Sequence, residues 1–300
     1  MKITMIGMGA VGAVVGKRLG EFLGYENMEC IADSQRKSRY EKNGISINGE
    51  RINFHFVTPE NAGKSDLVII ATKNLQLKDV LVQIEKAIGP ETTILSLLNG
   101  IQSEQELSEK FGKEKVLYGY IVNLSSTNEN GNITCGHEGT IYFGEDSNEI
   151  TPRVSEIKKL FDNAKVNSVV PEDIHLSQWK KFLLNVSCNT ISALCRQTYK
   201  GFRNEITQDV VRQCAREVVA VARKMGIALT DEMIEENIRM TSSLNDEGKT
   251  SMFQDVEAKR RTENDYFCGT IVKLGKELGI QTPVCDLLHK LIKCTESAWD

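Results

Sequence analysis

The chain has 300 residues, of which 40% are hydrophobic, 26% are charged and 6% are aromatic, and its formal net charge at pH 7 is −4. This length predicts two domains, and the ordinary composition excludes a chain that is disordered, collagen-like or a coiled coil throughout. The slight negative charge argues against a basic nucleic-acid-binding surface.

Further features of the composition bear on location and metal binding. No stretch approaches 18 consecutive apolar residues, so we expect no membrane span and a cytoplasmic protein. The eight cysteines include no C-x-x-C pair, which predicts separate buried thiols in a reducing compartment. The four histidines have no metal-ligand spacing, so we expect no metal site.

The N-terminal half alternates strand and helix signals. Apolar runs of strand length predict strands, and amphipathic runs between them predict helices. The expected strands are 2–6, 28–32, 67–71 and 92–98. The expected helices are a run that follows Gly12 and continues to Leu23, and 75–88, which is stopped by Gly89-Pro90. Continuous apolar strands separated by helices are typical of a doubly wound parallel sheet with helices on both faces.

The pattern changes after residue 111. We expect a meander of strands 116–124, 133–137 and 140–143 with a turn at 128–131, then a helix 152–164 and a strand 166–170. Beyond residue 171 only helices are expected, at 174–197, 206–225, 230–241, 251–278 and 283–298. The expected domains are therefore an α/β domain over 1–171 and an all-α domain over 172–300.

A glycine pattern directly follows the first strand and opens the first helix. Its residues are Gly7, Met8, Gly9, Ala10, Val11 and Gly12. In G-x-G-x-x-G the first glycine permits a tight turn, the second lets the backbone approach a pyrophosphate, and the third allows close helix–strand packing. Because the helix N-terminus adds amide donors and positive potential, this context favours dinucleotide binding over a merely glycine-rich turn.

The second strand ends at Asp33, about 20 residues beyond the last glycine, where a carboxylate accepts the adenine-ribose hydroxyls of NAD and repels a 2′-phosphate. Asp33 therefore favours NADH over NADPH. The alternative is an ordinary surface aspartate in a turn. Arg36, Lys37 and Arg39 follow it and could reach a phosphate.

Polar residues also follow the next two expected strands. Lys73 and Gln76 come after the third strand, and Asn99 comes after the fourth. The carboxyl ends of parallel strands are where open α/β sheets bind ligands, so these residues are candidate ligand contacts. The alternatives are a solvated loop lysine and an Asn-Gly turn at 99–100.

The first long helix of the C-terminal half carries a polar row on an otherwise apolar sequence. Lys181, Asn185 and Asn189 are spaced i, i+4, i+8, so they share one face of a regular helix. Buried polar groups are costly without partners, which indicates a ligand site. The alternative is a snorkelling surface lysine with two surface asparagines.

A second polar cluster lies at 250–266. Ser251 and Gln254 predict a capping box, which puts Ser251 at a helix N-terminus suited to a substrate carboxylate, with Glu263 about three turns further along. In the alternative interpretation Ser251 only caps the helix, and Glu263 pairs with Arg260 or Lys259.

The sequence resembles the ketopantoate reductase (2-dehydropantoate 2-reductase) family over essentially its whole length. The matching motifs are G-M-G-A-V-G at 7–12, T-K-x-x-Q at 72–76, N-G at 99–100, W-K-K-F-L-L-N-V-S-C-N-T-I-S-A-L at 179–194, S-M-F-Q-D at 251–255 and R-T-E-x-D-Y at 261–266. The last three together are specific to the family. Hydroxyisobutyrate and 6-phosphogluconate dehydrogenases share only the glycine loop and a K-x-x-x-N helix.

This resemblance implies a Rossmann domain followed by a helical domain like the C-terminal part of 6-phosphogluconate dehydrogenases. It implies that NAD(P)H reduces ketopantoate to D-pantoate, a step toward pantothenate. By resemblance Lys181 is the general acid and Glu263 the catalytic carboxylate and partner of a substrate hydroxyl. Asn99, Asn185, Asn189 and Ser251 would bind substrate, and the cofactor contacts would include Lys73, Gln76 and Asn99. A small-molecule substrate and a homodimer are expected, with no nucleic acid or membrane partner.

Asp33 departs from the family pattern, which usually has an arginine that reads the NADPH phosphate. Relatives that look like D-2-hydroxyacid (D-mandelate-type) dehydrogenases also carry an acidic residue there and use NAD. A second hypothesis is therefore an NAD-dependent dehydrogenase acting on branched or aromatic 2-keto acids. A third is a non-enzymatic dinucleotide-binding regulator with its cysteines as a redox switch, although no cysteine pair has redox-motif spacing.

Overall fold

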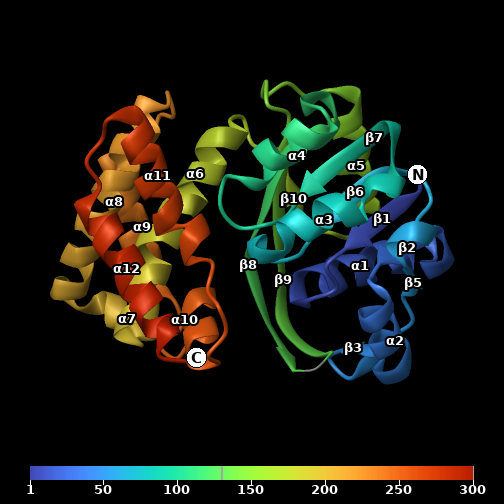
Figure 1. Ribbon diagram of the computed structural model, residues 1–300, viewed down its shortest axis with the longest axis horizontal. Helices are drawn as coiled ribbons and strands as arrows, with labels where there is room; N and C mark the ends of the chain where they lie inside the picture. The colour runs from blue at the N-terminus through green and yellow to red at the C-terminus, as the bar shows by residue number, and fades with distance from the viewer. Residues whose placement is uncertain (130, 300) are drawn as a thin grey trace. The chain divides into compact units, whose positions relative to one another are not determined.

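The computed structural model describes residues 1–129 and 131–299, which divide into two compact units, Met1–Ile174 and His175–Asp300 (Figure 1). The first unit is α/β and the second is helical, as the sequence predicts.

The N-terminal unit is built on six parallel strands in the order β5–β2–β1–β6–β7–β8. They are β1 (Ile3–Ile6), β2 (Met28–Ile31), β5 (His55–Val57), β6 (Ser65–Ile70), β7 (Ile88–Ser96) and β8 (Val116–Glu129). The chain starts in the middle of this order and winds first to one side and then to the other. The strand order therefore reverses between β1 and β6, which is where doubly wound sheets bind ligands.

Helices cover both faces of the sheet because successive strand residues point to opposite sides. Ile3 and Met5 of β1 face one core, which includes residues of α1 (Ala10–Leu23) and α5 (Pro152–Asn163). Ile6 faces a second core with α3 (Leu77–Gln83) and α4 (Ser103–Phe111). This two-sided burial explains the continuous apolar strands in the sequence.

The sheet extends further than the sequence predicts. In place of the expected meander, β8 pairs with a single long antiparallel strand, β9 (Asn132–Gly144), which also pairs with β10 (Ser168–Val169). Residue 130 of the expected turn lies outside the described residues. The expected helix 75–88 is shorter, because Gly89 and Pro90 lie within β7 rather than after a helix.

Three short strands and two helices are missing from the predicted set. They are β3 (Ile45–Ile47), β4 (Glu50–Ile52), β5, α2 (Ser34–Asn43) and α4. Strands of three residues are too short to produce a clear alternation of polar and apolar residues. α2 buries none of its residues, so it lacks an apolar stripe that the sequence could reveal.

The C-terminal unit is helical throughout its regular structure. Its helices are α6 (Ile174–Leu184), α7 (Thr190–Cys195), α8 (Glu205–Lys224), α9 (Asp231–Ser243), α10 (Ser251–Glu257), α11 (Cys268–Leu278) and α12 (Pro283–Ser297). A π-helical segment, Asn185–Asn189, joins α6 to α7, so the expected helix 174–197 is not regular.

The expected helix 251–278 is wrong, because α10 ends at Glu257 and α11 begins at Cys268. The break starts at Lys259, which has a φ of 51°, and the backbone N–H of Arg260 turns back to the carbonyl oxygen of Asp255 at 2.8 Å. Glycine usually occupies such a left-handed position at the end of a helix. With lysine there, the sequence carries no stop signal.

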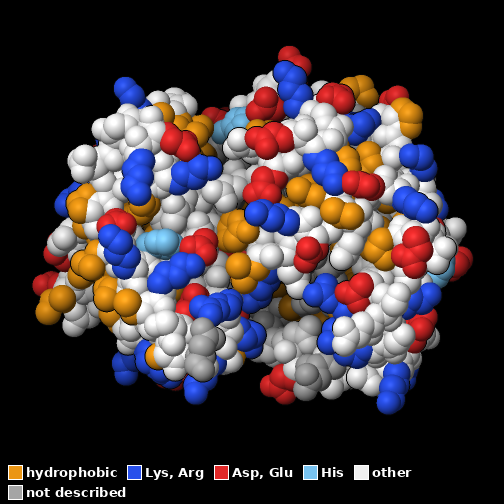
Figure 2. All heavy atoms as spheres, viewed as in Figure 1, with side chains coloured by type: hydrophobic (Ala, Val, Ile, Leu, Met, Phe, Trp, Pro, Cys, Tyr) orange, Lys and Arg blue, Asp and Glu red, His pale blue; other side chains and the backbone are white. Residues whose placement is uncertain are grey.

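Among the described residues, no helix is both long and apolar enough to cross a bilayer. On the face shown in Figure 2, basic and acidic side chains are interspersed. This mixture is consistent with the small net charge of −4, which does not indicate a basic nucleic-acid-binding surface.

Candidate active site

The glycine loop after β1 is shaped by two close backbone approaches. Gly7 has a φ of 94°, and a Cβ there would lie 2.5 Å from the carbonyl carbon of Ala71. A Cβ on Gly12 would lie 2.0 Å from the carbonyl oxygen of Gly7. Neither position can therefore carry a side chain, and the loop passes directly beside the end of β6.

Gly9 differs from these two glycines, because a Cβ there would meet nothing within 4 Å. It is the N-cap of α1 and has no side chain to accept the first amide hydrogens of the helix. Those amides and the positive end of the helix dipole are suited to an anion. The open space beside Gly9 and the tight packing at Gly7 and Gly12 fit the pyrophosphate of a dinucleotide.

The loops after β6 and β7 lie together at this edge of the sheet. The side-chain amide of Asn74 donates a 2.7 Å hydrogen bond to the backbone carbonyl of Asn99. Lys73 is exposed, whereas Gln76 and Asn99 are half-buried. The structure therefore gathers the predicted residues of these two loops close to the glycine loop.

Asp33 directly follows β2 and is the N-cap of α2. Its Oδ1 accepts a 2.7 Å hydrogen bond from the backbone N–H of Arg36, and its Oδ2 lies 3.4 Å from the Arg36 guanidinium. Its side chain is 41% exposed. Asp33 thus has a structural role in starting α2, and its carboxylate remains accessible at the carboxyl end of β2.

The polar row of the second unit spans the junction of α6 and the π segment. Lys181 is half-buried in the last turn of α6, while Asn185 and Asn189 are buried in the π segment. The Nδ2 of Asn189 donates a 3.1 Å hydrogen bond to the Oδ1 of Asn185. A π turn contains about one more residue than an α turn. Asn189, four residues after Asn185, therefore lies about one turn further along the helix, and the two side-chain amides meet.

The Nδ2 of Asn185 is buried and has no hydrogen-bond partner among the described residues. A buried donor without a partner costs about 1–3 kcal/mol. In native structures such a donor usually bonds to an ordered water or to a ligand. The amide of Asn185 is therefore suited to an oxygen atom of a ligand.

Ser251 does not cap α10, so the predicted capping box is wrong. The N-cap is Thr250, whose Oγ1 accepts from the backbone N–H of Phe253 at 3.2 Å and donates to Ser192 Oγ at 3.1 Å. Ser251 is the exposed first residue of the helix. The side-chain amide of Gln254 instead donates to the carbonyl oxygen of Lys249.

Glu263 lies in the segment between α10 and α11 rather than on a continuation of α10, and its side chain is buried. The preceding residue, Thr262, is anchored because its backbone N–H and Oγ1 donate to Glu296 Oε1 at 2.8 and 2.6 Å. Arg260, one of the expected partners, pairs with Asp255 at 2.9 Å.

One contact joins the segment that carries Glu263 to α6, the helix that carries Lys181, and a second joins α11 to α7. The ring of Phe267 lies edge-on to that of Phe182, with centroids 6.5 Å apart. The Sγ of Cys268 lies 3.6 Å from Thr190 Oγ1, just after the π segment. Elements far apart in the sequence thus meet beside α6 and directly after the π segment that contains Asn185.

The eight cysteines are free, but they are not all separate as the sequence predicts. The sulfur atoms of Cys214, Cys268 and Cys285 lie within 4.8 Å of one another, and all three residues are buried. They come from three different helices, so no local spacing could have revealed the cluster.

Comparison with known proteins covers almost the whole chain. Residues 3–148 match the family described as ketopantoate reductase PanE/ApbA, and residues 173–296 match the ketopantoate reductase PanE/ApbA C-terminal family. The 2-dehydropantoate 2-reductase of Pyrococcus horikoshii is 29% identical, with 99% of this chain and 98% of that protein aligned.

Two further relatives extend the comparison. An uncharacterized oxidoreductase of Bacillus subtilis, YkpB, is 27% identical, and the match covers 99% of each chain. A structure of D-mandelate dehydrogenase with NADH superimposes with a TM-score of 0.89 over all of both chains at 24% identity, which supports the fold.

Proposed function

Because the chain belongs to the ketopantoate reductase family and is therefore an oxidoreductase that acts on a CH–OH group with NAD(P), we propose that it reduces 2-dehydropantoate to D-pantoate. The coarser activity, reduction of a 2-keto acid by NAD(P)H, follows from the family. The choice of substrate is the proposal.

The observation that best supports a polar substrate is the buried Nδ2 of Asn185, which has no partner within the described residues. A keto acid offers carboxylate and carbonyl oxygens that accept hydrogen bonds from such a donor. Asn189 holds the amide of Asn185 in a fixed orientation, because its own amide donates to the Asn185 oxygen. In this proposal Asn185 and Asn189 bind and orient the substrate, and Ser251 and Asn99 contribute further contacts.

The reduced nicotinamide, when bound, supplies a hydride to the carbonyl carbon of the substrate. The carbonyl oxygen then needs one proton to become a hydroxyl group, and the Lys181 ammonium donates it as general acid. The same positive charge stabilises the negative charge that develops on that oxygen. The carboxylate of Glu263 accepts a hydrogen bond from a substrate hydroxyl.

The dinucleotide is proposed to be held by the first unit. The backbone amides of residues 7–12 bind the pyrophosphate, Lys73 and Gln76 contact the cofactor from the neighbouring loop, and Asn99 contacts it from the loop after β7. Asp33 accepts the ribose hydroxyls, so the proposed preference is NADH. The supporting observation is its exposed carboxylate at the end of β2.

An initial-rate panel tests the substrate and the cofactor together. Ketopantoate, phenylglyoxylate and 2-ketoisocaproate are each measured with NADH and with NADPH. We expect the highest kcat/KM with ketopantoate and NADH. A preference of about tenfold or more for the other two keto acids, equivalent to about 1.4 kcal/mol, would reject ketopantoate as the substrate.

Asp33 supports one second candidate function, an NAD-dependent D-2-hydroxyacid dehydrogenase for branched or aromatic 2-keto acids. A carboxylate at this position disfavours the 2′-phosphate of NADPH. The panel distinguishes the two functions, since it varies the acid and the cofactor independently. The homodimer stays a prediction that light scattering on the purified chain would test.

A further inference from the structure

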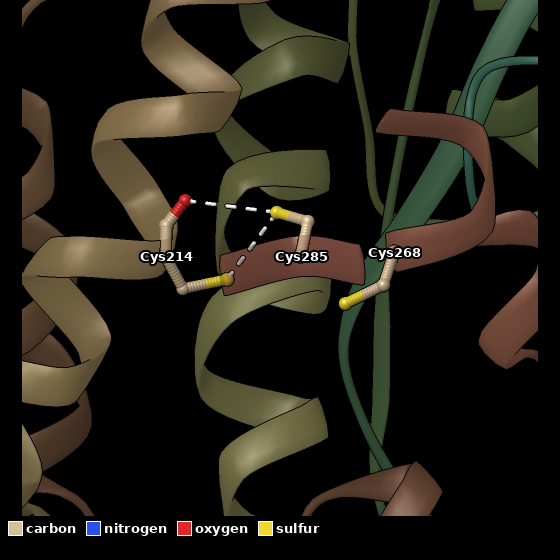
Figure 3. Close-up of side chains that lie close together, drawn as sticks. All are labelled: Cys214, Cys268 and Cys285. Carbon is tan, nitrogen blue, oxygen red and sulfur yellow. Dashed lines mark hydrogen bonds between the residues drawn. The ribbon is translucent and has the colours of Figure 1, made fainter. Parts of the chain in front are cut away.

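Three cysteines of the helical unit form a buried thiol cluster that the proposed reaction does not use. Cys214 lies in α8, Cys268 begins α11 and Cys285 lies in the first turn of α12 (Figure 3). Each is 0% exposed, and their sulfur atoms lie within 4.8 Å of one another. The sulfur atoms of Cys214 and Cys285 are 3.7 Å apart.

The spacing of this thiol cluster matches all-sulfur metal coordination. Three sulfurs placed about 2.3 Å from a central ion, a typical metal–thiolate distance, lie about 4 Å from one another in a trigonal plane. The distance of 3.7 Å between the sulfur atoms of Cys214 and Cys285 is close to this value, and all three separations are at most 4.8 Å, so an ion could be bound after side-chain movements of less than about 1 Å. Thiolates select soft ions, whereas hard cations require oxygen ligands.

Two helix N-termini at the cluster affect the charge of its thiols. Cys268 and Cys285 lie in the first turns of helices of 11 and 15 residues, where the helix dipole stabilises negative charge. The carboxylate of Glu217 opposes this at α12, since it accepts hydrogen bonds from the backbone N–H groups of Val284 and Cys285, both at 2.8 Å. The start of α11 therefore provides the clearer stabilisation.

The backbone carbonyl of Val186 in the π segment also faces the cluster. The thiols of Cys214 and Cys268 both point to its oxygen, at 3.9 and 3.7 Å. An ion bound by the cluster would thus connect α8, α11 and α12 beside the residue that follows Asn185.

We propose that Cys214, Cys268 and Cys285 form a binding site for one Cu(I) ion, coordinated by three sulfur atoms. Cu(I) is soft and suits thiolate ligands, while structural zinc almost always takes four ligands, of which this cluster supplies three thiolates. Three S–H bonds are replaced by three Cu–S bonds, and the three protons pass to solvent. No change of oxidation state is involved.

The test is an anaerobic titration of the reduced, metal-free full chain with Cu(I) in competition with the chromogenic chelator bicinchoninate. We expect one tightly bound Cu(I) per chain. Cys268→Ser and Cys285→Ser should each lose this ion. Cys188→Ser is the matched control, because Cys188 is equally buried in the same unit and lies outside the cluster, so it should retain the ion.

X-ray absorption of the copper-loaded wild-type chain gives a readout that does not depend on the folding of a variant. A first shell of three sulfur atoms is expected. Absence of stoichiometric binding, retention of the ion by Cys268→Ser, or a shell dominated by nitrogen or oxygen would each overturn the proposal. Turnover of keto acids by the metal-free chain is a separate measurement, and its result leaves this site unaffected.

Discussion

Lys181 and its neighbour Lys180 offer a matched pair for testing the proposed general acid. Both are half-buried on α6, but Lys180 lies 4.0 Å from Glu236, a surface pairing that contributes little. We expect Lys181→Ala to lower kcat by about 10²–10⁴-fold, because the carbonyl oxygen loses its proton donor. Lys180→Ala should keep wild-type rates.

Fluorescence titration with NADH should show that Lys181→Ala still binds the cofactor, since the glycine loop lies in the other unit. Full activity in this variant would contradict the proposed role.

The buried Nδ2 of Asn185, which has no partner among the described residues, leads to a prediction that separates binding from stability. Asn185→Ala should raise KM at least tenfold, a loss of about 1.4 kcal/mol in substrate binding. The control is Asn237→Ala, which also removes a buried side-chain amide nitrogen without a partner among the described residues, but from α9. Steady-state kinetics of the two variants should differ, and an unchanged KM in Asn185→Ala would count against the site.

Asp33 has two roles that substitution can separate. Asparagine caps helices as well as aspartate does, so Asp33→Asn should keep the start of α2 and lose only the negative charge. We expect Asp33→Asn to lower the ratio of kcat/KM with NADH to kcat/KM with NADPH, with little change in melting temperature.

Asp33→Arg should narrow or reverse the preference and also lose the cap, at a cost of about 0.5–2 kcal/mol. Kinetics with both cofactors and thermal melts measure the two effects. Better use of NADPH by the unaltered enzyme would show that Arg36, Lys37 or Arg39 outweighs Asp33.

At the scale of elements, the segment between α10 and α11 depends on charge pairs with α12. Asp265 accepts hydrogen bonds from His289 Nε2 at 2.7 Å and Lys293 Nζ at 2.6 Å. Burial raises the pKa of Asp265, but the bonds from Lys293 and His289 outweigh it, so its net pKa is lowered. A lowered carboxyl pKa stabilises the fold above the unfolded pKa of about 3.9, and this contribution is lost as the pH falls through the folded pKa.

Asp265→Asn should therefore unfold at a lower denaturant concentration than wild type at pH 7. The difference should shrink as the pH falls below about 4, where the wild-type carboxyl also becomes protonated. Denaturant melts across this range measure it. A difference that stays constant with pH would mean that Asp265 acts through packing rather than charge.

The elements that the sequence predicts best are those whose cause is local. The glycine loop, α5 and the apolar strands each follow from neighbouring residues. The sequence does not reveal the π segment or the left-handed Lys259, because neither place has a glycine or proline to mark a break and tertiary packing decides the backbone there.

At the scale of the whole molecule, the family motifs predict both units and the residues of the polar row. Contacts between residues of elements that are distant in the sequence are predicted less well. Phe182 and Phe267, or Cys214, Cys268 and Cys285, meet only because helices pack side by side, and no spacing in the chain records such contacts. A binding site is therefore easiest to predict from one sequence when the residues that form it lie close together in the chain.

The π segment has a consequence for how the second unit tolerates insertions and deletions. A π turn holds about one more residue than an α turn for nearly the same rotation, so removing one residue from the middle of 185–189 would restore an unbroken α-helix and leave α7 in nearly the same orientation relative to α6. Thr190 would then keep its place beside Cys268, and Ser192 its place beside Thr250. The extra residue is thus absorbed within this short stretch, and the loss of one residue there should be tolerated better than a deletion within α6 or α7.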